Sequence, residues 1–541
     1  MDILTSGNGT VVPKSGLSFK ESSYVNWVTQ NLSNWGIAAT ILVLLISYDQ
    51  KIYPRADFQD SIHGIIHTST LPKVRAYQEQ WASGDISCVS VFHKYVPHLL
   101  SCWTAKLTIF SYIRFVVLAS ERDIARKVFN STAFVKPCLI PVAESLLGPS
   151  VWVFLDGKRH VDFRRGLNVL FTRKALQCYL PIQEKVWSQY FEKFVPIPFM
   201  GQFREINCAL SCRTFVGDYI SQAAVKRIAD NYYCITAALE LVNIPLSLYF
   251  PYSKVWLGKR AADRVLAEFK KCAATSRLSM AAGREPTCTM DQWILSMIES
   301  KAYQDKVAAG IATAEELEKS KPTVLLRDFT DFEIAQTMFT FLFASQDASS
   351  SATTWLFQIM AQRPDILYKV REENLAAREK SMRSGQSLGL EMLESLTYTN
   401  AVVKETLRYR PPVIFVPYTT KKPFKITPTY TVPKGAMIVP SCYPALHDPE
   451  VYPQPEVFDP KRWISGNAAE QTKNWLVFAT GPHNCIAQQY VQLTMTAMIG
   501  KASLEMDWVH HPTARSDEIK VFATLFPMDD CPMIFTKRER Q

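Results

Sequence analysis

The chain has 541 residues, of which 48% are hydrophobic and 20% charged, and its formal net charge is +10. This composition excludes bulk disorder and allows a large buried core. The sequence lacks fixed-period repeats and low-complexity tracts, which excludes repeat architectures. Its basic residues are scattered among 50 acidic ones, which argues against nucleic-acid binding. We interpret the positive charge as a basic surface that faces anionic lipid or an acidic protein partner.

Twelve cysteines are sparse for this length, and none belongs to a CxxC pair or to a regular framework. This usage favours a reducing compartment over a disulfide-stapled extracellular domain. Each cysteine is therefore expected to be a small buried hydrophobic residue unless its neighbours argue otherwise.

An apolar, uncharged segment runs from Trp35 to Tyr48, and charged residues follow it. Because about 20 residues are needed to cross a bilayer, an ordinary buried helix is the alternative interpretation. We expect an uncleaved membrane anchor helix over residues 35–50, preceded by a luminal segment over residues 1–34. One large domain over residues 51–541 then lies in the cytosol, because Lys and Arg are more frequent after the anchor than before it.

The middle of the chain reads as a series of helices, whereas residues 412–445 contain short β-type runs broken by Pro and Gly. The sequence therefore predicts a mainly α protein, with a large helical domain and small β-sheets. The segment 331–362 is long enough for eight or nine helical turns and is apolar nearly all round between Ile334 and Ala344. We expect this helix to run through the core.

Short polar side chains interrupt the apolar helix at residues 344–351, with Asp347 among them. Such residues prefer caps and turns to helix interiors, and a local conflict of this kind often marks a functional site. A buried carboxylate also needs partners or a wet cavity. A polar stripe that faces solvent is the alternative, and the sequence alone leaves both open.

Near the C-terminus, Cys485 lies where a tight loop enters a helix, in the sequence FATGPHNCIA. Gly481 is expected to shape the turn, and Phe478 to pack beside the cysteine. Backbone N–H groups and the positive helix end would point at the sulfur, which lowers a thiol pKa and suits a thiolate metal ligand. Taken alone, a buried structural cysteine is the alternative.

Two further motifs lie between the long helix and the cysteine loop. Glu405 and Arg408 share one helix face at i, i+3, and a proline pair ends that helix. The sequence FDPKRW follows, with Arg462 as its second basic residue. The Glu405–Arg408 pair is a weak signal alone, because such pairs are common on solvated helix faces.

In this order, the four motifs resemble the cytochrome P-450 family from about residue 60 to the end. The resemblance implies that residues 51–541 form a haem-thiolate catalytic domain in which Cys485 is the axial ligand of the haem b iron. It also implies a structural ion-pair network of Glu405, Arg408 and Arg462. Arg164 would pair with a haem propionate.

The chain departs from the family pattern at several positions around the cofactor. Ala348 follows Asp347 where most members have Thr, so we expect Asp347, Ser349 and ordered water to relay protons instead. His483 and His160 replace the usual cofactor-binding Arg and Trp, which predicts weaker or pH-sensitive propionate contacts.

The strings FASQDASSSATTW and FATGPHNC resemble the fungal sterol 22-desaturase branch of this family. That branch inserts a double bond into the sterol side chain in ergosterol synthesis, at the endoplasmic reticulum membrane, consuming dioxygen and reductant from NADPH. No dinucleotide-binding fingerprint is present in the sequence, so a separate NADPH-cytochrome reductase is the expected electron partner. The apolar segment 244–251 is expected to contact membrane lipid. Family position places six residues in the substrate cavity, although each suits ordinary core equally well: Ala344, Val413, Ile414, Phe415, Leu525 and Phe526.

Three rival functions remain open at this stage. A sterol hydroxylase, demethylase or isomerase would keep the fold and change the reaction. A haem-binding gas sensor or electron carrier would keep Cys485 but have little use for Asp347. A structural membrane protein would bind no haem at all.

Overall fold

The computed structural model describes residues 116–138, 141–149, 151–193, 199–239, 248–310, 313–384, 389–428, 430–521 and 524–538. Contacts divide the chain into Met1–Val74 and Arg75–Gln541, and every described residue belongs to the second unit. The expected luminal segment and membrane anchor lie outside the described residues, as does the first half of the segment 244–251. No helix within the described ranges is long and apolar enough to span a membrane.

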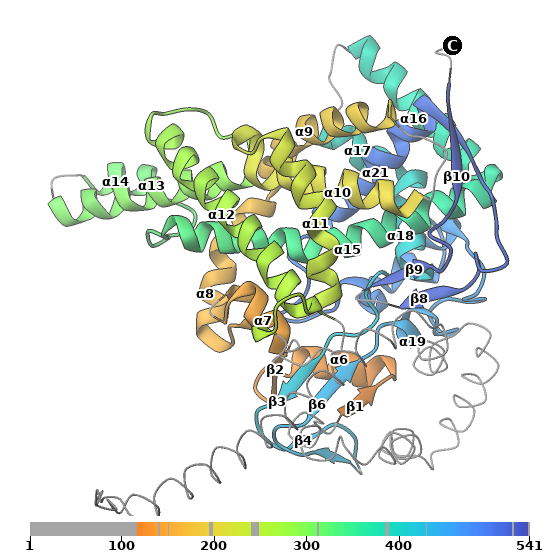
Figure 1. Cartoon of the computed structure of the whole chain (residues 1–541), viewed down its shortest axis with the longest axis horizontal. Coiled ribbons are helices and arrows are strands. Elements are labelled where there is room, and N and C mark those ends of the chain that lie inside the picture. The colour runs from red at the N-terminus through yellow and green to blue at the C-terminus, as the bar shows by residue number, and fades with distance from the viewer. Residues whose placement is uncertain are drawn as a thin grey trace, which may run out of the picture. The chain divides into compact units, whose positions relative to one another are not determined.

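Helices make up most of the described chain (Figure 1), which confirms the predicted mainly α class. The α-helices are α6 (Arg122–Asn130), α7 (Pro141–Leu147), α8 (Gly157–Asn168), α9 (Arg173–Phe191), α10 (Phe199–Val216), α11 (Gln222–Ala238), α12 (Lys254–Ala281), α13 (Thr289–Ala309), α14 (Ala314–Ser320), α15 (Asp331–Gln362), α16 (Pro364–Ser384), α17 (Leu390–Ser395), α18 (Thr397–Tyr409), α19 (Tyr443–Leu446), α20 (Asn467–Glu470) and α21 (Gln488–Glu505).

The β-structure of the described residues is confined to small sheets. A four-stranded sheet has the order β1-β6-β3-β2, in which β1 and β6 are parallel and the other pairs are antiparallel. Two-stranded antiparallel sheets pair β4 with β5, β7 with β10, and β8 with β9. The strands are β1 (Val116–Ala119), β2 (Val135–Pro137), β3 (Tyr418–Thr420), β4 (Phe424–Lys425), β5 (Thr431–Val432), β6 (Met437–Pro440), β7 (Met506–His510), β8 (Ile519–Val521), β9 (Leu525–Pro527) and β10 (Met533–Lys537).

Helix α15 covers the predicted segment 331–362 and is buried along most of its length. It begins with a capping box: Thr330 Oγ1 accepts a hydrogen bond from the Glu333 N–H, and the Glu333 carboxylate accepts one from the Thr330 N–H. These bonds satisfy two of the N–H groups that a helix start leaves without partners. The cap therefore fixes where the long core helix starts.

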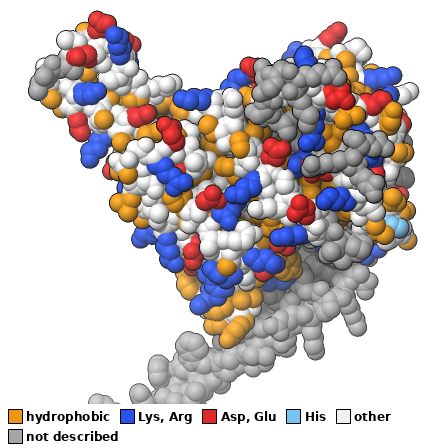
Figure 2. Space-filling view, turned by 90° about the horizontal axis from the view of Figure 1, so that it is seen from above, with side chains coloured by type: hydrophobic (Ala, Val, Ile, Leu, Met, Phe, Trp, Pro, Cys, Tyr) orange, Lys and Arg blue, Asp and Glu red, His pale blue; other side chains and the backbone are white. Residues whose placement is uncertain are grey.

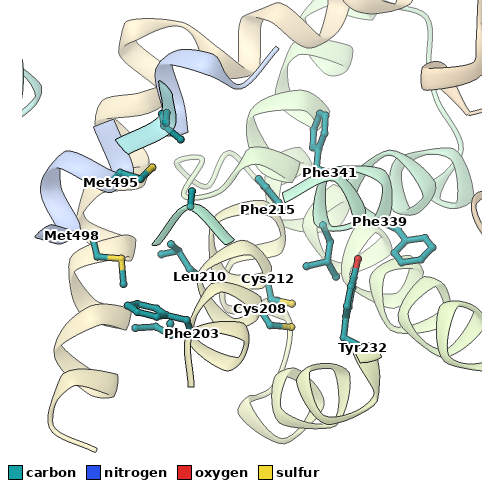
Figure 3. Packing of buried hydrophobic residues seen from close by; sticks show 14 of the residues in the cluster. Phe203, Cys208, Leu210, Cys212, Phe215, Tyr232, Phe339, Phe341, Met495 and Met498 are labelled. Carbon is teal, nitrogen blue, oxygen red and sulfur yellow. The ribbon is translucent and has the colours of Figure 1, made fainter. Parts of the chain in front are cut away.

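Helix α10 packs against α15, α9 and α11. The close view of the core shows labelled side chains of α10 together with those of α11, α15 and α21 (Figure 3). Aromatic rings join α10 to α15, with centroids 5.6 Å apart for Phe215 and Phe341 and 4.8 Å apart for Phe203 and Phe357. Because a close-packed interior resists sliding, these contacts fix the register of the two helices. Polar residues on α10 are thereby held opposite the polar stretch of α15.

Basic and acidic side chains are interspersed over the face of the molecule drawn in Figure 2. That face carries no single-sign stripe of the kind that tracks a nucleic-acid backbone.

We predict that Thr330→Ala lowers the free energy of unfolding by about 1 kcal/mol, because the first turn of a core helix loses its cap. The urea-unfolding midpoint of the full chain in detergent measures the effect. Thr313 caps α14 with the same box, but α14 buries no residue, so Thr313→Ala should leave the global midpoint unchanged. Equal shifts in the two variants would contradict this account of α15.

Candidate active site

The loop around Cys485 is closed by its own backbone. A 3₁₀ turn ends at Phe478, Ala479 then takes a φ of 55°, and the Cys485 N–H donates to the Phe478 carbonyl at 3.0 Å. Ala487 is the N-cap of α21. The cysteine is therefore held between a tight loop and the start of a helix, as its sequence predicted.

Gly481 is required at its position by two independent constraints. Its φ of +80° lies in the left-handed region, which side chains disfavour. A Cβ would also lie 2.6 Å from the Phe129 carbonyl oxygen and 2.9 Å from Asn130 Oδ1, both at the end of α6. The glycine thus lets the cysteine loop lie directly against α6.

The electrostatics of the Cys485 thiol differ from the sequence-based expectation. Burial is the largest influence and raises the pKa of the thiol, while the Ala487 N–H and the Arg164 guanidinium lower it. The predicted lowering is therefore wrong, because desolvation of the charged form outweighs the helix end. The Cys485 side chain is nevertheless accessible to solvent. An accessible sulfur deep in the protein suits a metal ion, whose charge would deprotonate the thiol.

A cationic group from α8 lies beside the cysteine loop. The half-buried Arg164 donates from Nη2 to Asn484 Oδ1 at 2.8 Å, and no described carboxylate forms an ion pair with it. Burial lowers the pKa of this guanidinium, and the charge of Cys485 opposes that effect. A half-buried cation without an acidic partner fits an anionic group such as a haem propionate.

The two histidines that depart from the family pattern contact each other. The rings of His160 and His483 lie 3.9 Å apart between centroids, at 31°. Burial is the main cause that lowers the pKa of both, to about 4 for His483, and neighbouring positive charge adds to it. Both imidazoles are thus neutral at pH 7, when each carries one N–H donor. Together with Arg164 they fit the edge of a haem.

The carboxylate of Glu405 forms buried ion pairs with two arginines. Arg408 binds it through Nε and Nη2, both at 2.9 Å, and Arg462 Nε reaches it at 3.0 Å. Trp463 Nε1 donates to the same carboxylate at 2.9 Å. Glu405 and Arg408 are fully buried, and the remaining guanidinium N–H groups bond to backbone carbonyls. The network predicted from the sequence is thus assembled in one place.

Asp347 is 7% exposed and is held by residues from two other helices. Its Oδ1 accepts from Arg204 Nη1 of α10 at 2.5 Å, and its Oδ2 accepts from the Thr236 hydroxyl of α11 at 2.9 Å. Ser349 is half-buried, and no hydrogen bond among the described residues joins its hydroxyl to Asp347. The structure therefore does not bring the two expected relay residues into direct contact, and their roles stay a proposal.

The residues expected around the substrate come from three segments. Ile414 and Leu525 pack in one cluster with Trp355 of α15, and the Leu525 N–H donates to the Pro412 carbonyl at 3.0 Å. Phe526 is buried, Val413 and Phe415 are half-buried, and Ala344 is exposed although it lies mid-helix in α15.

Sequence reasoning missed Arg204 and Thr236, the partners of Asp347. Both are far from Asp347 along the chain, and neither belongs to a motif, so no local signal marked them. Trp463 was visible within FDPKRW, and its indole contact with Glu405 only emerged from the fold.

Comparison with known proteins matches residues 207–517 to the family model described as Cytochrome P450. The chain belongs to the cytochrome P450 family. This P450 is 57% identical to C-22 sterol desaturase ERG5B of Gibberella zeae, over 99% of this chain and 98% of that protein. It is also 57% identical to cytochrome P450 monooxygenase oblE of Emericella variicolor, over 93% of each chain, and 46% identical to C-22 sterol desaturase ERG5 of Saccharomyces cerevisiae, over 94% and 91%.

Among solved structures, retinoic acid bound cyanobacterial CYP120A1 matches with a TM-score of 0.65 at 20% identity, covering 79% of this chain and 90% of that one. This likeness confirms the expected P450 fold. The protein is accordingly a haem-thiolate oxidoreductase, whose electrons come from a reductase.

We predict that Glu405→Gln in this P450 abolishes most folded, haem-loaded protein. The change leaves Arg408 and Arg462 buried without a negative partner, which typically costs about 3–5 kcal/mol. Haem content per total expressed chain measures the outcome. Asp365→Asn, which removes the acid of the exposed pair with Arg363, is the matched control and should change stability by less than about 1 kcal/mol. A Glu405→Gln protein with the parent's haem content would refute the structural role of the network.

Proposed function

We propose that this cytochrome P450 is a C-22 sterol desaturase of ergosterol biosynthesis. One observation carries the proposal: relatives with the name C-22 sterol desaturase, from five fungal sequences, are 46–57% identical over nearly the whole chain. Similarity over that length includes the substrate-facing segments as well as the haem-binding core. The reaction removes two hydrogens from neighbouring side-chain carbons and, with dioxygen, two electrons and two protons, forms two waters.

The cofactor of the proposal is haem b, whose iron the Cys485 thiolate would hold, with Phe478 and Gly481 shaping the loop around that cysteine. When bound, the haem supplies the dioxygen chemistry that removes substrate hydrogen. Arg164, His160 and His483 would hold its propionates, since they offer one cation and two neutral imidazoles at one place. Electrons would come from NADPH through a separate reductase.

Proton supply is assigned to the polar stretch of α15. Ala348 stands where most family members have a Thr hydroxyl. We therefore assign proton transfer to the Asp347 carboxylate, which would reach Ser349 through water. Arg204 and Thr236 orient that carboxylate in the resting arrangement. Freeing Asp347 from this pair would therefore precede proton transfer.

Substrate positioning is assigned to apolar residues on both sides of α15. Ile414 and Leu525 form one wall, beside Val413, Phe415 and Phe526, and Ala344 contributes the exposed point of the helix. A wall of aliphatic and aromatic side chains suits a hydrocarbon sterol tail. Close packing of that tail holds two neighbouring carbons in place, which desaturation requires.

The proposed location is the endoplasmic reticulum membrane. Residues 35–50 would anchor the chain, with residues 1–34 luminal and the catalytic domain 51–541 cytosolic. Tyr249 within the apolar segment 244–251 and Tyr252 directly after it are 76% and 79% exposed. Exposed tyrosines are typical of the membrane–water interface, so this region is proposed to contact lipid near the substrate entrance.

A second candidate function is oxygen insertion, because the equally similar relative oblE carries the name monooxygenase. The two reactions share the fold and the cofactor. They differ in the product, which loses two hydrogens in one case and gains one oxygen atom in the other.

We predict that the purified chain, with an NADPH reductase and a sterol that is saturated at C-22, gives a product about 2 mass units lighter than the substrate. Mass spectrometry of the sterol fraction measures this. Cys485→Ala should abolish both turnover and the reduced carbon monoxide absorption band of a thiolate-ligated haem. Cys178→Ala on α9 is the matched control and should retain both. A product that is heavier by one oxygen would replace the desaturase by the second candidate.

A further inference from the structure

A turn near the C-terminus brings a second carboxylate, Asp530, to the start of α10, the helix that carries Arg204. Residues 529–531 follow β9, and both Asp530 and Cys531 adopt positive φ values, 59° and 56°. Non-glycine residues rarely take this conformation, and two in succession are held only by surrounding contacts. The strain therefore calls for a structural or functional reason.

The turn is fixed against the start of α10. The N–H groups of Phe199 and Met200 donate to the carbonyls of Cys531 and Asp530, at 3.2 and 3.1 Å. Asp529 is held separately, because the Thr513 hydroxyl, the Ser516 hydroxyl and the Cys531 N–H all donate to it. The turn thus satisfies free N–H groups at the start of α10, one turn before Arg204.

Asp530 itself is left without a complete set of partners. Its Oδ1 is buried and accepts no hydrogen bond among the described residues. Burial is the main cause that raises the pKa of this carboxyl, and the charge of Asp529 adds to it, while the charges of Lys520 and Arg204 oppose it. No ion pair within 4 Å joins Asp530 to either cation in the described structure. A buried acceptor without a partner normally has an explanation.

Arg204 is the cation that could become the partner of the Asp530 carboxylate. Its Nη1 binds Asp347, and its Nη2 donates to the Thr236 hydroxyl at 3.3 Å. The guanidinium is mostly buried, so losing Asp347 would leave an uncompensated charge. An arginine fork offers five N–H donors and can engage two carboxylates without leaving the interior.

We propose that Asp530 is the alternative carboxylate partner of Arg204, which accepts the guanidinium when Asp347 releases it. Asp530 is then a positioning residue: it touches no substrate, and it acts by making the Asp347 carboxylate available. The role of Asp530 in turnover rests on the proposed proton-supplying function of Asp347. The exchange of ion-pair partners by Arg204 does not depend on that function.

The exchange is tested without turnover by comparing the thermal unfolding of the parent, Asp347→Asn, Asp530→Asn and the double variant. With Asp347 in place, Asp530→Asn should shift the midpoint by less than about 1 °C, because it removes an acceptor without a partner. In the Asp347→Asn background, Arg204 depends on Asp530, so the same change should lower the midpoint by about 2 °C or more.

Asp529→Asn provides the matched control. It removes the same charge from the neighbouring residue, whose carboxylate is already bonded to Thr513 and Ser516. Its shift should be the same in both backgrounds. Equal shifts for Asp530→Asn in the two backgrounds would overturn the proposal. Because no sterol is turned over, this result stands whether the enzyme proves to be a desaturase or a monooxygenase.

Steady-state kinetics separate positioning from a merely structural role. Asp530→Asn should lower kcat about tenfold with an unchanged KM for the sterol, and Asp530→Glu should restore kcat. Arg204→Lys should lower kcat in the same way, because an ammonium group lacks the fork that reaches both acids. A parent-like kcat in both Asp530→Asn and Arg204→Lys would overturn the proposal.

Discussion

The buried negative charge of the Glu405 carboxylate needs positively charged partners inside the protein. These partners link helix α18 to the segment that leads to the Cys485 loop. Arg408 comes from the same helix, whereas Arg462 and Trp463 come from the segment that leads toward the cysteine. From Trp463, ring contacts of 5.4 Å continue to Trp475 and from there to Phe478, whose carbonyl accepts the Cys485 N–H. The loop that carries Cys485 is therefore linked, through packed rings, to a buried charge on α18.

The buried charges of the site differ in how many oppositely charged partners they have. Glu405 is fully satisfied by its own protein, which makes it a fixed structural element. Arg164 has no acid of its own among the described residues, and it suits a ligand's negative charge. Arg204 is paired, and the turn that carries a second carboxylate, Asp530, is bonded to the start of its helix. These three arrangements support our proposals of a structural role for Glu405, cofactor binding by Arg164 and an exchange of partners at Arg204.

Features of the fold and the site could be predicted from the sequence where the residues involved lie close together along the chain. The helix 331–362 was predicted because its apolar pattern is local, and the Glu405–Arg408 pair because i, i+3 spacing places both on one face. The contact of Arg204 with Asp347 and the ring contact of His160 with His483 join segments more than a hundred residues apart, which only tertiary packing brings together. The sign of the pKa shift at Cys485 was also beyond the sequence, because it depends on how deeply the fold buries the sulfur.

The attachment of β9 to α15 bears on how enzymes of this kind acquire new substrates. The Leu525 carbonyl accepts hydrogen bonds from both Trp355 Nε1 and the Ser351 hydroxyl, so the backbone of this wall is held independently of the side chain at 525. Residues at 414 and 525 can therefore change in size during evolution while the strand keeps its place. A change of substrate at this position then needs few replacements and no change of scaffold.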